Sequence, residues 1–198
     1  MQFILGHWPL AFVCVAMIVS AVIDGWKLKV PNWLTYPIIL SGWALGLVHT
    51  FGLAESTGEG GIGASLICTA VGFALLFPVY SIGGMGAGDV KMQMGFGAWI
   101  GAFYGLAPGD EHPGGAWIIV YAFCLAVVIG GVIALGMIFF RGQLRTNLAN
   151  AREILGDLLR AKSVTTNAAA RKSRMHLLPY GIPLCLGFVS YLIYLHGV

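Results

Sequence analysis

Long uncharged stretches of apolar residues alternate with short polar segments along this chain. A helix needs about 20 apolar residues to cross the hydrocarbon core of a bilayer. None of the stretches shows the alternating pattern of a barrel strand, and a backbone in lipid must form its hydrogen bonds internally. The pattern therefore predicts an all-α, polytopic membrane protein with six transmembrane helices, the fourth being the shortest. The six stretches are Phe3–Ile23, Trp33–Leu53, Ile62–Ile82, Met92–Ala107, Ala116–Phe140 and Leu177–Leu195.

The composition excludes an ordinary soluble fold. The 198 residues are 58% hydrophobic and only 10% charged, whereas a soluble domain carries about 25% charged residues. Six spans and their connections use nearly the whole chain, so we expect one membrane-embedded domain over residues 1–198. No basic residue precedes Phe3–Ile23, and the run is long for the apolar region of a signal peptide. We therefore expect that this helix is not cleaved off as a signal peptide.

Basic residues fall on one side of the predicted membrane. If successive spans cross in opposite directions, Asp24–Asn32, Gly83–Lys91 and Arg141–His176 share a side, and they contain all 11 lysines and arginines. The positive-inside rule then places this side in the cytoplasm and the N-terminus outside. The charged residues of the opposite connections are all acidic: Glu55, Glu59, Asp110 and Glu111.

The basic segment Arg141–His176 is the only long connection. Within it apolar residues recur at helical spacing, while the arginines lie off that stripe. We therefore expect an amphipathic cytoplasmic helix between spans five and six, bound to the anionic inner leaflet. A topology anchor is the simpler interpretation, and a regulatory or partner site is the alternative. The stripe consists of Leu144, Leu148, Ala151, Leu155 and Leu158.

Cysteine and histidine residues do not form a recognisable metal site. The four cysteines lie singly in apolar stretches without a CxxC pair, and the five histidines form no HExxH sequence. The glycine-rich segment before Asp89 lacks the GK[ST] sequence of a phosphate-binding loop. We expect no metal, no cofactor and no nucleic-acid partner.

Two acidic residues on the cytoplasmic side are candidates for chemistry. Asp24 ends the first apolar run and Asp89 precedes the fourth, so both lie at one membrane level. An acid at membrane depth is costly and usually is paired or faces a water-filled cavity. One interpretation is simple pairing of Asp24 with Lys27 and of Asp89 with Lys91. The other is a reaction site, because four of the six residues in Gly83–Gly88 are glycines and such a loop would admit an extended peptide beside Asp89.

Paired carboxyl groups can hydrolyse a peptide without a metal. Two that are close enough to share a proton cannot both ionise cheaply, so one serves as base and the other as acid. The base deprotonates a water that attacks the peptide carbonyl, and the acid binds the carbonyl oxygen and then protonates the leaving amine. Because the two groups titrate together, neither role is assigned to a particular aspartate.

Three segments of the chain resemble the type IV prepilin peptidases, a family of GxGD-type intramembrane aspartic peptidases. Their order matches the family pattern across nearly the whole chain. The resemblance implies that Asp24 and Asp89 are catalytic, and we expect Gly86, Gly88, Lys27 and Lys91 to shape the site. The segments are Asp24 and Lys27 followed by Val30-Pro31-Asn32, then Gly86-Ala87-Gly88-Asp89-Val90-Lys91, and finally Leu178-Pro179-Tyr180-Gly181-Ile182-Pro183.

The resemblance also implies a reaction and a place. The family removes the short basic leader of type IV prepilins or pseudopilins at the cytoplasmic face of the bacterial inner membrane, cutting after a glycine that precedes the hydrophobic helix. Larger members carry paired cysteines and also methylate the new N-terminus. This chain lacks those cysteine pairs, so it resembles the short, peptidase-only form of tight-adherence pilus systems, and we expect no N-methyltransferase activity. The prolines and Asn32 are interpreted as helix-start residues.

Two other functions fit part of the pattern. A small proton- or cation-coupled transporter or channel would use the same two acids to bind an ion, but it predicts acids near the bilayer midplane and an internal repeat. An inactive assembly subunit of a pilus or secretion machine would keep the six helices without needing both acids.

Overall fold

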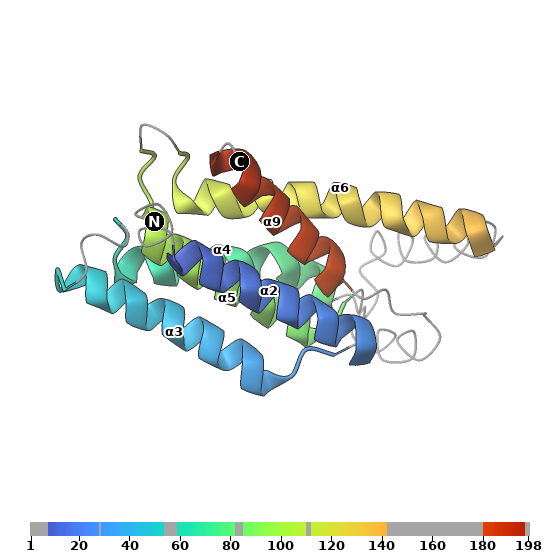
Figure 1. Cartoon of the computed structure of the whole chain (residues 1–198), viewed down its shortest axis with the longest axis horizontal. Helices are drawn as coiled ribbons and strands as arrows, with labels where there is room; N and C mark the ends of the chain where they lie inside the picture. The colour runs from blue at the N-terminus through green and yellow to red at the C-terminus, as the bar shows by residue number, and fades with distance from the viewer. Residues whose placement is uncertain are drawn as a thin grey trace.

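The computed structural model describes residues 8–27, 29–53, 59–81, 85–109, 112–141 and 180–196. These residues form six helices, so the predicted all-α class is confirmed (Figure 1). Three of the helices, over Trp8–Lys27, Ile62–Ser81 and Gly115–Met137, are long and apolar enough to cross a membrane, as expected of a membrane protein. The full count of six crossings stays a prediction. The helices are α2 (Trp8–Lys27), α3 (Asn32–Thr50), α4 (Ile62–Ser81), α5 (Ala87–Tyr104), α6 (Gly115–Arg141) and α9 (Gly181–His196).

Two helix boundaries differ from the expectation in a way that matters for the site. Helix α2 continues past Ile23 to Lys27, and α5 begins at Ala87, five residues before the expected start. The expected loop beside Asp89 is therefore wrong in part, because Asp89 lies in the first turn of α5. The physical reason is a hydrogen bond that caps the start of α5. Gly86 is extended at φ −81° and ψ 151°, and its N–H bonds the side chain of Asp89, the third helical residue. An acid in the first turn also suits the helix dipole.

The predicted amphipathic helix within Arg141–His176 lies outside the described residues, apart from Arg141 at the end of α6.

Helix α5 forms the centre of the bundle. It packs against all five other described helices, and 13 of its 18 residues are buried. Close packing is possible because Gly97 and Gly101 form a GxxxG pattern facing α4, where any side chain would meet the α4 backbone. A helix surrounded on all sides can hold polar groups away from water, and this is the helix that carries Asp89.

Four helix ends meet at one end of the bundle, which we call the aspartate end. Helices α3 and α5 begin there side by side and run in the same direction. Gly88 packs on Val30, just before α3, and Gly95 packs on Ile38 further along. Helix α2 ends there and α9 begins there; the two lie side by side in Figure 1. The described lysines Lys27, Lys29 and Lys91 belong to the same end. The opposite end, which we call the far end, holds the last turns of α3, α5 and α9.

Candidate active site

Asp24 lies on the buried face of α2, three residues before the helix ends. Its side chain is only 4% exposed, although it is an acid in an otherwise apolar helix. The backbone N–H of Gly181 donates a hydrogen bond of 2.9 Å to Asp24 Oδ2. This donor is free because Gly181 is the first residue of α9, whose opening N–H groups have no intrahelical acceptor. The start of α9 therefore holds Asp24.

Asp89 is held in a similar way by the start of its own helix. Its side chain is 5% exposed, and Oδ2 accepts a hydrogen bond of 3.2 Å from the N–H of Gly86. The other oxygen, Oδ1, is buried and has no hydrogen-bond partner among the described residues. Among the described residues, one oxygen of the Asp89 carboxylate is thus hydrogen-bonded and the other is not.

The two aspartates come together from helices far apart in sequence. Both lie at the aspartate end, and the Asp24 carboxylate is close enough to act electrostatically on Asp89. Within the described part of the chain, neither carboxylate forms an ion pair. Pairing of Asp89 with Lys91 is not seen. Instead, the Lys91 ammonium donates to Asn32 Oδ1 at 2.8 Å and lies 4.7 Å from the centre of the Tyr36 ring.

The four residues expected to shape the site have different surroundings. Gly86 contacts an aspartate directly, through its N–H. Gly88 instead packs against the backbone of Val30, where an added Cβ would lie about 3.1 Å from the Val30 nitrogen and oxygen. Lys91 joins α5 to α3 through its hydrogen bond to Asn32. Lys27 is exposed at the end of α2. Gly88 and Lys91 thus hold Val30 and the start of α3 against α5.

Sequence reasoning missed the role of Gly181 and the buried Gln93, and it assigned Asn32 differently. Gly181 belongs to the third segment that resembles the family but had no role assigned to it, yet its N–H binds Asp24. Gln93, one turn after Asp89, is fully buried, and its presence as the one amide within the Met92–Ala107 run was the available signal. Asn32 was expected to cap α3, but the N-cap is Pro31, and Asn32 accepts from Lys91.

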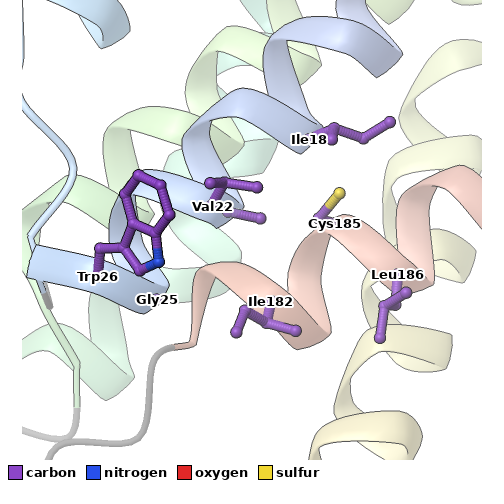
Figure 2. Close-up of a pocket in the computed structure, with 8 residues that line it drawn as sticks. Ile18, Val22, Gly25, Trp26, Ile182, Cys185 and Leu186 are labelled. Carbon is purple, nitrogen blue, oxygen red and sulfur yellow. The ribbon is translucent and has the colours of Figure 1, made fainter.

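An apolar groove of about 510 Å³ runs between α2 and α9 (Figure 2). It adjoins the site because Gly25 follows Asp24 in α2 and Ile182 follows Gly181 in α9. No charged side chain lines it, so the groove offers apolar contact rather than reacting groups. Its lining consists of Ile18, Ala21, Val22, Gly25, Trp26, Ile182, Cys185 and Leu186.

Comparison with known proteins agrees with the resemblance seen in the sequence. No curated protein and no solved structure matches this chain significantly. The model of the type IV leader peptidase family does match, over residues 11–135, a range that includes Asp24, Asp89 and the glycines before Asp89. The match covers more than half of the chain and confirms the family expected from the three segments. This chain belongs to the type IV leader peptidase family.

Proposed function

We propose that this protein is an aspartic endopeptidase that removes the leader from type IV prepilins or pseudopilins, with Asp24 and Asp89 as the catalytic pair. One observation carries the proposal: two acids from separate helices are both at least nine-tenths buried, interact electrostatically and have no cation beside them among the described residues. Burying an acid without a countercharge is costly, so a fold that does so twice at one place favours a chemical role.

The surroundings of the pair support acid–base chemistry. Each carboxyl group has one oxygen held by a backbone N–H, from Gly181 or from Gly86. These bonds orient the groups, and the mutual repulsion of two charges in a buried site favours the state in which the pair carries one proton. Such a pair contains a base and an acid at the same time.

The reaction proceeds with one water and no other reactant. The ionised carboxylate removes a proton from the water as its oxygen bonds to the peptide carbonyl carbon, while the protonated carboxyl donates a hydrogen bond to the carbonyl oxygen. The C–N bond of the tetrahedral intermediate then breaks, and the proton held by the acid passes to the leaving amine. The products are a leader with a new carboxylate and a shortened pilin with a new amine.

The groove between α2 and α9 supports a substrate with an apolar helix. A prepilin has a basic leader followed by a hydrophobic helix, so the scissile bond lies where a polar segment meets an apolar one. A similar junction lies at Asp24, since the next residue, Gly25, lines the apolar groove, whereas Asp24 itself is polar. We propose that the substrate helix lies along the groove with its cleavage site beside Asp24.

The finer features of the proposal follow from the sequence pattern. The enzyme acts at the cytoplasmic face of the bacterial inner membrane, which it crosses six times with the N-terminus outside. It is the short form of the family, one domain over residues 1–198 without N-methyltransferase activity, and it serves tight-adherence pili. The segment 141–176 anchors it to anionic lipid. Lys27 and Lys91 mark the cytoplasmic side.

The test is cleavage of a candidate prepilin co-expressed with the wild-type chain, Asp24→Asn or Asp89→Asn, read by the size of the substrate. Asparagine preserves shape and an acceptor oxygen but cannot exchange the proton, so each variant should lose at least about a hundredfold in rate. Glu59→Gln makes the same chemical change at the far end and should cleave normally. Membrane levels of all variants are compared.

Continued cleavage by either aspartate variant would refute the aspartic mechanism. A wild-type chain that cleaves none of several prepilins would instead favour the transporter or the assembly subunit.

A further inference from the structure

Gln93 presents a buried amide without a partner one helical turn after Asp89. Residues four apart on a helix share a face, so Gln93 and Asp89 are neighbours on α5. Gln93 is 0% exposed, and neither its nitrogen nor its oxygen has a hydrogen-bond partner among the described residues. Asp89 Oδ1 is in the same condition. Two side chains one turn apart on α5 therefore carry three polar atoms without a partner among the described residues.

Packing alone does not explain a glutamine at this position. The methylene part of Gln93 fits against α4, since a Cβ added to Gly72 would lie 3.3 Å from Gln93 Cγ. A methionine, the residue on either side of it in the sequence, has nearly the same length and would fill that space without burying an unbonded amide. Leaving buried donors and acceptors unbonded destabilises a fold. Packing therefore explains the methylene part of Gln93 but not its amide group.

We propose that Gln93 is a positioning residue for Asp89: its amide and Asp89 Oδ1 together hold one water molecule at the active site. A buried water needs two to four polar partners, and the three unbonded atoms provide them. Gly86 holds Asp89 Oδ2, so a water on Oδ1 would complete the hydrogen bonding of this carboxyl group and fix its orientation. The inference rests on the proposed peptidase function and adds a residue that lies outside the glycine–aspartate segment.

The test compares the purified full-length wild-type chain with Gln93→Met, measuring kcat and KM for prepilin cleavage and the melting temperature. Methionine keeps the size and removes the amide, so kcat should fall roughly tenfold or more because the water and the Asp89 carboxyl lose their positions. KM should stay within about twofold, since Gln93 does not line the groove. The melting temperature should stay equal or rise, because methionine fills the same space and needs no hydrogen-bond partner.

Thr35→Val is the matched control. Thr35 on α3 is also fully buried, and its hydroxyl oxygen also has no partner in the described part of the chain, but it does not share a helix with Asp89. This variant should keep kcat and gain stability. An equal loss of kcat in Thr35→Val would show that activity responds to any buried polar group, and would overturn the role assigned to Gln93.

Two results would overturn the inference alone: a Gln93→Met enzyme with kcat within about twofold of wild type, or a loss of kcat accompanied by a lower melting temperature, which a packing role predicts. A wild-type chain that cleaves no prepilin would overturn the proposed function and this inference with it. The two failures are therefore distinguishable in one experiment.

Discussion

The backbone N–H of Gly181 donates a 2.9 Å hydrogen bond to Asp24 Oδ2 across 157 positions of the chain. The first residue of α9 thereby holds an acid near the end of α2. A Cβ added to Gly181 would lie 2.9 Å from that oxygen and 3.0 Å from the Asp24 Cβ, so only glycine fits without displacing the acid.

Gly181→Ala should therefore lower kcat/KM for prepilin cleavage by roughly tenfold or more, because a displacement of Asp24 by a fraction of an ångström disturbs its alignment with substrate. Gly63→Ala in α4 is the control. Nothing lies within 4 Å of the added methyl there, so activity should persist and stability should rise by up to about 1 kcal/mol. Normal cleavage by Gly181→Ala would show that the contact with Asp24 does not matter for the reaction.

Gly86 allows the hydrogen bond to Asp89 to be removed without a change of backbone shape. Its φ of −81° is close to the value that proline requires, but proline has no N–H to donate to Asp89 Oδ2. Gly86→Pro should slow cleavage by about tenfold or more, since a hydrogen bond to a charged group contributes about 1.5–3 kcal/mol. Steady-state kinetics of the purified variant provides the measurement.

Gly86→Ala is the matched variant, because it keeps the N–H and its Cβ would lie at an ordinary 3.4 Å from Asp89 Oδ2. It should stay close to wild type in rate. Equal rates for the alanine and proline variants would mean that the Gly86 N–H does not contribute to catalysis.

The groove between α2 and α9 can be narrowed from its open side. Val22 lines the groove and is 48% exposed, so the fold should tolerate Val22→Trp. The larger side chain should fill part of the groove in which we propose that the substrate helix binds. We expect KM to rise about fivefold or more, equivalent to about 1 kcal/mol of lost apolar contact, with kcat little changed. Val19→Trp changes a similarly exposed residue of α2 outside the groove and should leave KM unaltered. A rise in KM for both variants would point to a general effect on α2.

The far end should contribute to stability and not to catalysis. Tyr104 Oη and His196 Nε2 lie 2.7 Å apart and join α5 to α9 by a hydrogen bond. Tyr104→Phe should lower the free energy of unfolding by about 0.5–1.5 kcal/mol and leave kcat unchanged. Thermal unfolding in detergent, with Tyr194→Phe at a 79% exposed position of α9 as control, measures the first effect. A large loss of kcat would show that the two ends of the bundle are coupled.

Local patterns in the sequence predicted much of this molecule. Each of the six apolar runs overlaps a described helix, because hydropathy over 16 to 25 residues is a property of each segment by itself. The two aspartates were identified for a similar reason, as acids at the edges of apolar runs. The exact ends of α2 and α5 were not predictable in this way, since the cap at Gly86 depends on whether its N–H finds the Asp89 side chain.

The sequence by itself determined the helical class, the membrane character, the family and the identity of the candidate acids, because each of these depends on residue types within one short segment. Only the tertiary structure decided that Gly181 holds Asp24, that Lys91 binds Asn32 instead of Asp89, and that Gln93 is fully buried. Those relations depend on which helices become neighbours. Helix packing is set by close contacts of small residues across the whole chain, and no local pattern specifies it.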